Sequence, residues 1–373
     1  MLIITIIIFL LVLGVLVFVH ELGHFIMAKR AGAKVEEFGF GFPPRIFGVK
    51  KGETVYSINL IPIGGFVNIV GENGEGKDDQ RSFSSKTVWQ RFQILIAGVT
   101  ANILLAIILF SMVSYIGFPY LYDEESAKGV SGLKIAIMEV APNSPAQAAG
   151  INAGDVILSL KTEGGDESME IKSIGDVKGF IGGNHGKIII FNIKRGDKIL
   201  DLKAEARANV SEKEGATGIS LGAMSEPVSS GLLESVRQGI IKTWDVSAFI
   251  IITLSGLLKE LFTTGGTTEQ LSGPVGIAIM VGQATELGLS YVLQFMGLLS
   301  INLAIINALP FPALDGGRIL FLLIEKIKGS RVSAETEGKF HFAGMALLLL
   351  LMALVTYKDF GTYHIWQKIT SFL

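Results

Sequence analysis

Four long runs of uncharged, mostly apolar residues constrain this chain more than any other feature of its sequence. They cover residues 2–19, 92–122, 287–314 and 342–357. An α-helix needs about 20 apolar residues to cross the hydrocarbon core of a bilayer, and the first run reaches that length with the residues that follow it. A signal peptide would begin with basic residues and end in a small-residue cleavage site, and neither is found before residue 20. We therefore predict an α-helical polytopic membrane protein with four transmembrane helices.

The composition agrees with a membrane protein and excludes several kinds of site. Charged residues make up 18% of the 373 residues, against about 25% in soluble domains. The net charge of -2 leaves no basic surplus for binding nucleic acid. Because the chain has no cysteine, disulfides, thiolate zinc sites, iron–sulfur clusters and thiol nucleophiles are all excluded.

The basic residues predict how the chain is oriented in the membrane. No Lys or Arg precedes residue 20, whereas residues 29–91 hold ten, and residues 318–339 hold several more. The positive-inside rule places both segments in the cytoplasm, which leaves the N-terminus and the long segment between the second and third runs outside. A shorter apolar stretch, residues 246–258, has too few residues to cross, so we expect an interfacial or protein-covered helix there.

The first run ends in the motif HELGH, residues 20–24. On a helix, His20 and His24 share one face, so both imidazoles can reach one metal ion. Glu21 lies beside them, where its carboxylate could take a proton from a water that attacks a substrate. Ionisable residues at membrane depth are costly and usually functional. The alternative is a polar cluster that only marks the end of a span, but such a cluster has no need for this spacing.

The third run ends in a broken helix that offers a third metal ligand. Residues 307–317 read NALPFPALDGG, in which Pro310 and Pro312 interrupt the helix at membrane depth. Catalytic zinc takes three protein ligands and keeps a fourth position open. Asp315 follows the break and precedes two glycines that permit close approach, so we predict it as the third ligand. Alone, Asp-Gly-Gly would indicate an ordinary turn.

These motifs together resemble those of the site-2 proteases, which are intramembrane zinc metalloproteases, and most closely the regulator of sigma-E protease type. The similarity covers nearly the whole chain and includes SGPVGI at residues 272–277 and G-x-x-x-N at residues 98–102. It implies that one Zn²⁺ per chain is bound by His20, His24 and Asp315, with Glu21 as the general base. Residues 55–70, turned at 62–65, are similar to the family's membrane-associated β-hairpin. The resemblance also implies substrate contacts for six residues: Asn102, Asn302, Asn307, Gly64, Gly65 and Phe66.

Not every polar residue near these motifs is expected to act in catalysis. Asn102 could join two helices instead of contacting substrate. His341 is expected to be an interface residue, and His185 and His364 to have no role at the site.

The pattern changes to short strands and turns over residues 132–206. We expect strands at 133–140, 155–160, 187–194 and 199–204, a helix at 171–181, and linkers at 211–222 and 263–273. Residues 141–157 resemble a PDZ domain through nine positions: Ser144, Pro145, Ala146, Ala149, Gly150, Ile151, Gly154, Asp155 and Ile157. PDZ domains bind an extended peptide, such as a C-terminus, at a sheet edge. The receiving strand is expected near Gly132 and Leu133; a spacer without ligand is the alternative.

The predicted order of segments combines these readings into a helical membrane protein with an inserted α+β PDZ domain. The best-known sigma-E-type members carry two tandem PDZ domains, and this chain has room for one. The predicted segments are 1–28, transmembrane helix with HExxH; 29–91, cytoplasmic loop and β-hairpin; 92–122, transmembrane helix; 126–208, PDZ domain; 209–286, linker and interfacial helix; 287–317, transmembrane helix with LDGG; 318–339, cytoplasmic loop; 340–357, transmembrane helix; and 358–373, tail.

The resemblance implies an intramembrane zinc endopeptidase of the bacterial inner membrane. Its substrates would be single-pass membrane proteins, such as anti-sigma factors or remnant signal peptides, cut first outside the membrane in regulated intramembrane proteolysis. The active site would face the cytoplasmic side, with a polar cavity near His20 that admits water. Two alternatives remain: a non-catalytic PDZ membrane adaptor, and a zinc transporter whose pathway is lined by Asn102, Asn307 and Asp315.

Overall fold

The computed structural model describes residues 2–72, 79–119, 121–122, 132–141, 143–165, 167–196, 198–208, 215–263 and 272–362. The chain divides into two compact units. The first comprises Met1–Met112, Ser235–Gly282 and Val292–Leu373, and the second Val113–Glu234 and Gln283–Tyr291. Four predicted pieces lie outside the described residues: the start of the predicted PDZ domain at 126–131, linker residues 211–214 and 264–271, and tail residues 363–373 with His364.

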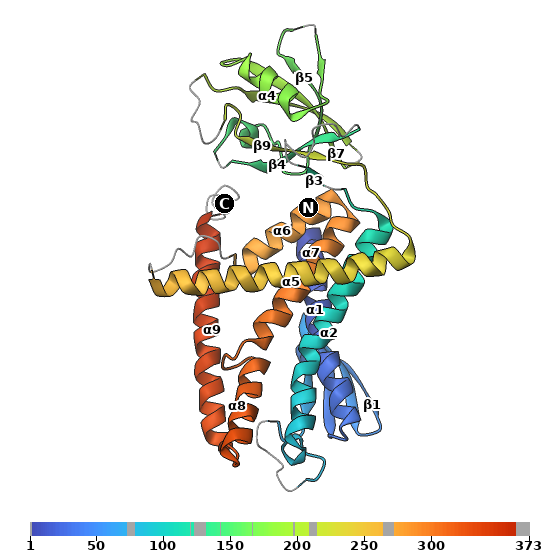
Figure 1. Ribbon diagram of the computed structural model, residues 1–373, viewed down its shortest axis with the longest axis vertical. Helices are drawn as coiled ribbons and strands as arrows, with labels where there is room; N and C mark the ends of the chain where they lie inside the picture. The colour runs from blue at the N-terminus through green and yellow to red at the C-terminus, as the bar shows by residue number, and fades with distance from the viewer. Residues whose placement is uncertain are drawn as a thin grey trace. The chain divides into compact units, whose positions relative to one another are not determined.

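Long apolar helices make up most of the first unit (Figure 1). The four predicted runs are confirmed as helices: α1 (Leu2–Arg30), α2 (Val88–Ile116), α7 (Leu289–Ala308) and α9 (Ala334–Thr362). A short 3-10 helix, η1 (Phe83–Ser85), precedes α2, and the remaining helices of this part are α5 (Leu232–Thr263), α6 (Pro274–Leu287) and α8 (Asp315–Lys328). By length and composition, five of the described helices could cross a membrane: the four runs and α5.

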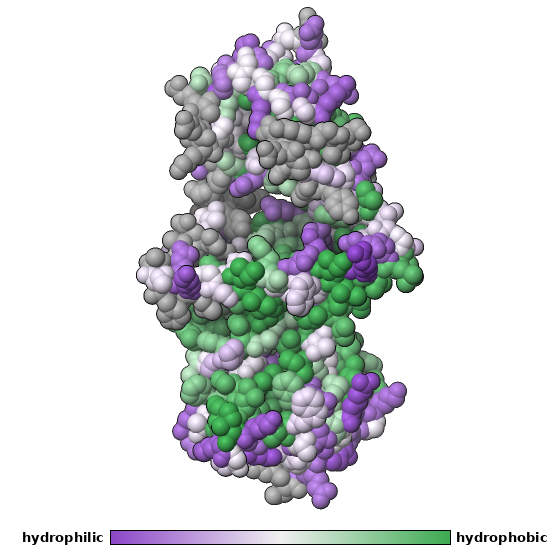
Figure 2. Space-filling view, viewed as in Figure 1, coloured by the Kyte–Doolittle hydropathy of each residue, from purple (hydrophilic) through white to green (hydrophobic). Residues whose placement is uncertain are grey.

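The surface of these helices is apolar where a water-soluble protein would be polar. Ile3 is 73% exposed, Phe342 76% and Leu354 56%. Figure 2 shows hydrophobic residues gathered over the body of the first unit and hydrophilic ones at its end, where α8 meets α9 in Figure 1. Soluble proteins rarely expose continuous apolar patches above a few hundred Å². The first unit is therefore suited to lipid, and the chain is a multi-pass membrane protein.

The helix α5 is longer than the sequence predicted. It has 32 residues, whereas the apolar stretch suggested only residues 246–258. Figure 1 shows it lying across α1, α2 and α9 and not along them. One side packs closely, because a Cβ atom on Gly239 would overlap Ser111 of α2, and Val246 packs against the buried cluster of Ala106, Phe110 and Ile301. The other side is apolar and open, with Trp244 75% exposed, as in helices that lie in a membrane interface.

Strands β1 (Val35–Lys51) and β2 (Thr54–Ile69) form an antiparallel hairpin. The chain reverses at Gly52 and Glu53 between the two strands. It reverses again within β2, because residues 55–58 pair with residues 37–40 in ascending order and residues 65–68 pair with the same residues in descending order, which confirms the predicted turn at residues 62–65. Gly52 has φ +65, which the tight turn requires and only glycine adopts readily. Gly64 has φ +87 and also allows close packing, because a Cβ atom there would lie 2.8 Å from Val17 Cγ1 of α1.

The second unit contains a sheet whose described strands run in the order β3-β9-β4-β5-β7-β8, with β6 paired to β5. Its core includes the fully buried side chains of Phe191, Ile135 and Leu160. The predicted strands and helix are found within a few residues of their expected bounds. The elements are β3 (Leu121–Tyr122), β4 (Lys134–Val140), α3 (Pro145–Ala148), β5 (Val156–Thr162), β6 (Met169–Glu170), α4 (Ile174–Gly182), β7 (Ile188–Arg195), β8 (Lys198–Glu205) and β9 (Ile219–Met224).

Strand β9 corrects two predictions. It overlaps residues 211–222, which the sequence indicated as a linker, and it pairs with β4. Ile135 and Ala136 of β4 pair with both β5 and β9, so the strand that follows Gly132 and Leu133 lacks there the free edge that peptide addition needs. The pairing of β9 is a long-range contact, and the glycine-rich sequence of this segment carries little local strand preference.

A buried carboxylate from α9 holds the start of α6. Asp359 is 2% exposed, and its Oδ1 and Oδ2 accept the backbone N–H groups of Gly273 (3.1 Å) and Gly276 (2.8 Å). The first N–H groups of a helix lack partners and favour a negative charge. A Cβ atom on Gly273 would lie 2.8 Å from Asp359 Oδ2. This contact explains why residue 273 of the SGPVG motif at residues 272–276 is a glycine.

We expect Asp359→Ala to lower the thermal unfolding midpoint of the purified protein in detergent. The substitution leaves two buried N–H groups unpaired, at about 1–3 kcal/mol each. Asp359→Asn keeps one acceptor and should lose less stability. The matched control is Asp245→Ala at an exposed acid of α5, and equal midpoints for the three variants would contradict the capping role.

Candidate active site

Two histidines of α1 and an aspartate of α8 meet in the first unit. Asp315 Oδ2 lies 3.0 Å from His20 Nε2 and 3.2 Å from His24 Nε2, and the two Nε2 atoms lie 3.2 Å apart. The histidines are 7% and 6% exposed, and the Asp315 side chain 19%. These residues form a group that could hold a metal ion.

The donor set fits zinc. Asp315 Oδ2 is buried and makes no geometrically sound hydrogen bond to the described residues, although it faces both imidazoles. A buried carboxylate oxygen normally has a partner, and a cation between the three side chains would supply one. Two imidazole nitrogens and one carboxylate oxygen are ligands of catalytic zinc, and they leave the fourth tetrahedral position open.

The outer nitrogen of each imidazole is also held. His24 Nδ1 donates to the carbonyl of Ile94 at 2.8 Å, which leaves the lone pair of Nε2 for a metal. His20 Nδ1 lies 3.3 Å from the Asn102 side-chain amide, and Asn102 Oδ1 has no partner among the described residues. With the amide turned by 180°, Oδ1 would accept the His20 Nδ1–H and leave Nε2 free. Asn102, fully buried, therefore lies where it can orient His20.

Helices α1 and α2 pack closely, and glycines at their contact leave the space that the imidazoles occupy. A Cβ atom on Gly98 would overlap His24 Nε2 and lie 2.7 Å from His20 Cε1, while one on Gly23 would overlap the carbonyl of Ala97. Small residues let membrane helices approach in this way. The G-x-x-x-N element at residues 98–102 thus combines a space for both imidazoles with an amide against one of them.

Asp315 is the first residue of α8 and follows an irregular turn. The predicted break is confirmed, since α7 ends at Ala308 and two prolines stand before α8 begins. The turn folds back over the start of α8: Cβ atoms on Gly316 and Gly317 would overlap the carbonyls of Leu309 and Phe311. The two glycines therefore permit the approach that brings Asp315 to the histidines.

The hairpin passes beside Glu21. A Cβ atom on Gly65 would lie 3.8 Å from Glu21 Cγ and 3.6 Å from Phe18 Cα. Among the predicted substrate residues, Gly64, Gly65 and Phe66 lie on the part of β2 that passes Glu21. Asn302 and Asn307 lie on α7, half-buried and without a hydrogen bond to another described residue.

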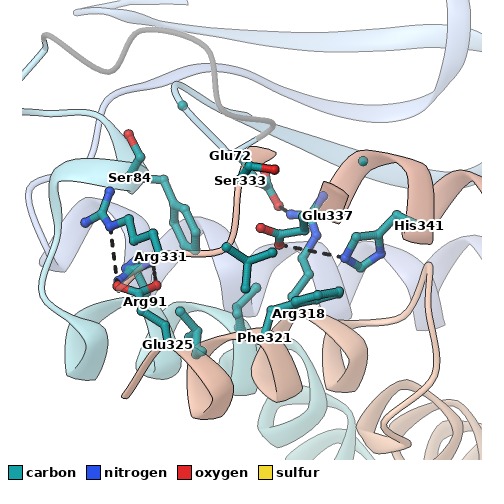
Figure 3. Close-up of a pocket in the computed structure, with 16 residues that line it drawn as sticks. Glu72, Ser84, Arg91, Arg318, Phe321, Glu325, Arg331, Ser333, Glu337 and His341 are labelled. Atoms are coloured by element: carbon teal, nitrogen blue, oxygen red, sulfur yellow. Dashed lines mark hydrogen bonds and ion pairs between the residues drawn. The ribbon is translucent and has the colours of Figure 1, made fainter. Parts of the chain in front are cut away.

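A cavity of about 360 Å³ is lined by charged, polar and apolar side chains, and none of His20, Glu21, His24 and Asp315 is among them (Figure 3). Its lining includes Leu95, adjacent to the Ile94 carbonyl that holds His24, and Arg318, three residues after Asp315. Both Nη atoms of Arg91 donate to the Glu325 carboxylate, at 2.6 and 2.9 Å, and these bonds lower the pKa of Glu325. Because His20 does not line this cavity, the polar space expected beside His20 stays a prediction.

Two other histidines can now be placed. His185 lies in the second unit, where its ring nitrogen contacts the Arg207 carbonyl at 3.1 Å. His341, predicted as an interface residue, accepts the backbone N–H of Ala313 at 2.8 Å. Sequence reasoning missed this contact, because nothing local links residues 28 positions apart.

Comparisons with known proteins agree with this geometry. The sequence model of peptidase family M50 matches residues 8–351. The zinc metalloprotease RasP of Geobacillus kaustophilus is 32% identical over 97% of the chain and 99% of the relative. The regulator of sigma-W protease RasP of Bacillus subtilis is 32% identical over 95% and 98%. The zinc metalloprotease RasP of Oceanobacillus iheyensis is also 32% identical over 95% and 98%.

Proposed function

The chain belongs to peptidase family M50, and we propose that it is an intramembrane zinc endopeptidase that cleaves single-pass transmembrane proteins. One observation carries the proposal: His20, His24 and Asp315 converge at a buried point, with Glu21 next to them on the same helix. In this assignment the three converging side chains bind one zinc ion and Glu21 is the general base.

The residues of the site divide the chemistry between them. Bound zinc would polarise the scissile carbonyl and make the attacking water more acidic. Glu21 takes the proton of that water and returns it to the leaving amine. Ile94 holds His24 in the tautomer that ligates, and Asn102 would do the same for His20 with its amide turned by 180°.

We propose that the unwound substrate binds along strand β2. A protease must extend a helical substrate, and an extended strand in lipid needs partners for its backbone groups. Residues 55–58 of β2 pair with β1 on both edges, whereas residues 65–68 pair only with residues 37–40, so this end of β2 keeps an edge that can accept another strand. We assign Gly64, Gly65 and Phe66 to this edge because β2 passes Glu21, and assign Asn302 and Asn307 to the substrate backbone.

We further propose that the protein crosses the bacterial inner membrane four times, through α1, α2, α7 and α9. The transverse course and open apolar side of α5 support an interfacial position for this helix. The last turn of α8 carries Lys326 and Lys328, and the positive-inside rule favours the cytoplasm for this end. The N-terminus and the second unit would then lie outside.

The second unit is proposed to be a single PDZ domain. In support, Ser144 caps α3 by accepting the Gln147 N–H, and buried Asp155 binds the Arg195 guanidinium through both oxygens at 2.6 and 2.7 Å. We assign peptide binding to β9, because among the described residues β3 pairs only with its last two residues. The domain would admit substrates whose outer part has already been shortened.

The Bacillus subtilis relative is named for regulating sigma-W, which supports anti-sigma factors as one substrate class in regulated intramembrane proteolysis. Remnant signal peptides are a second class with the same single-pass topology. A PDZ adaptor would need neither the metal group nor Glu21. A zinc transporter would need the metal group but would not cleave.

Metal removal tests the proposal. The purified protein in detergent should cleave a tagged single-pass reporter within its transmembrane segment, lose this activity on treatment with a zinc chelator, and regain it when zinc is restored. Cleavage that survives complete zinc removal would contradict the zinc mechanism. Absence of cleavage, with zinc uptake into liposomes containing the protein, would favour the transporter.

A further inference from the structure

We propose that His341 is a positioning residue that fixes the position of the metal-binding carboxylate of Asp315. It acts on the ligand loop, residues 309–314, which joins α7 to α8. The inference rests on the proposed function, since it concerns the same metal centre.

The ligand loop contains a conformation that its own sequence disfavours. Ala313 has φ +75, in the left-handed region that side chains other than glycine rarely adopt. Such a residue keeps its conformation only when the surroundings hold it. Because Ala313 is two residues before Asp315, whatever holds Ala313 also fixes the direction from which the carboxylate enters the site.

His341 of α9 holds Ala313 in this conformation. Its Nδ1 accepts the Ala313 N–H at 2.8 Å, so the proton of the neutral ring lies on Nε2. Nε2 lies 3.8 Å from the carboxylate of Glu337, one turn earlier on α9, which favours this tautomer. The side chain is 16% exposed and packs against the Phe321 ring of α8 at the edge of the cavity in Figure 3.

A second contact from α9 holds the neighbouring residue of the loop. Gly344 lies one helical turn beyond His341, and a Cβ atom there would lie 2.6 Å from the Pro312 carbonyl oxygen. Helix α9 therefore seats Pro312 and Ala313 together, and Gly316 and Gly317 close the loop against α8. Because the loop is held on both sides of Asp315, and only Leu314 separates Ala313 from Asp315, a displacement of Ala313 would also displace Asp315.

The test uses full-length protein in detergent and compares His341→Leu with His341→Asn. Leucine provides an apolar side chain without a hydrogen-bond acceptor, whereas asparagine places Oδ1 close to the position of Nδ1. Zinc affinity is measured by competition with a chelator, and ligand geometry by the visible absorption of Co²⁺ in the site. Loss of an outer partner typically costs 10–100-fold in metal affinity. We expect a loss of about this size and an altered Co²⁺ spectrum for His341→Leu, with recovery of both in His341→Asn.

Gly344→Ala provides a second route should His341→Leu fail to fold, since it displaces the same loop and leaves the hydrogen-bond acceptor in place. It should weaken zinc binding in the same direction. Wild-type zinc affinity and Co²⁺ spectrum in both His341→Leu and Gly344→Ala, or no recovery in a folded His341→Asn variant, would overturn the positioning role. Wild-type protein that binds no zinc would overturn the metal centre itself.

Discussion

Glu21→Gln is expected to reduce the rate of substrate cleavage by about 10²–10⁴-fold, the usual contribution of a general base. Glutamine has nearly the shape of glutamate but cannot take a proton from water. The metal group consists of His20, His24 and Asp315, so the variant should retain the zinc content of the wild type. The loss should appear in kcat, because the proton is transferred in the reacting complex.

The measurement is the cleavage rate of a single-pass reporter, with zinc content determined on the same preparation. Glu36→Gln is a matched control, because Glu36 is an exposed carboxylate on β1. Unchanged cleavage by a zinc-loaded Glu21→Gln variant would show that another group handles the proton.

Gly98→Ala should have a comparably large effect through a single methyl group. Its Cβ atom would overlap His24 Nε2 and lie 2.7 Å from His20 Cε1, so both imidazoles must shift. A displacement of about 1 Å can cost about 100-fold in rate, and we expect a loss of this order together with reduced zinc content. The measurements are zinc per chain and reporter cleavage.

Gly256→Ala is the matched control for this prediction. It makes the same change in helix α5, where a new Cβ atom would meet nothing within 4 Å. Full zinc content and activity in Gly98→Ala would mean that the imidazoles do not pack on α2 as described.

The metal group could be predicted from the sequence because its signals are local. HExxH spacing sets two imidazoles on one helix face, and the prolines before Asp315 end a helix wherever they occur. The long apolar runs likewise identify helices without knowledge of their neighbours. The structure confirms the convergence of the three side chains and the long helices, whereas the catalytic roles of the residues are proposals.

The features that the sequence did not predict depend on long-range contacts. The strand β9 acquires its structure by pairing with β4, more than 80 positions away. Pairing within residues 35–69 places residues 55–58 and 65–68 on the two edges of residues 37–40, and the sequence predicted the turn at residues 62–65 but not the turn at Gly52 and Glu53. The contact of His341 with Ala313 joins a helix to a distant loop, and that of Asn102 with His20 joins two helices, so only the fold reveals them.

The zinc content of the purified protein tests the central claim most directly. Elemental analysis of the wild type, His24→Ala and Asp315→Ala should find about one zinc per chain in the wild type and a large loss in each variant, since each removes one of three protein ligands. A wild-type protein without zinc, or an Asp315→Ala variant that keeps a full zinc equivalent, would contradict the account.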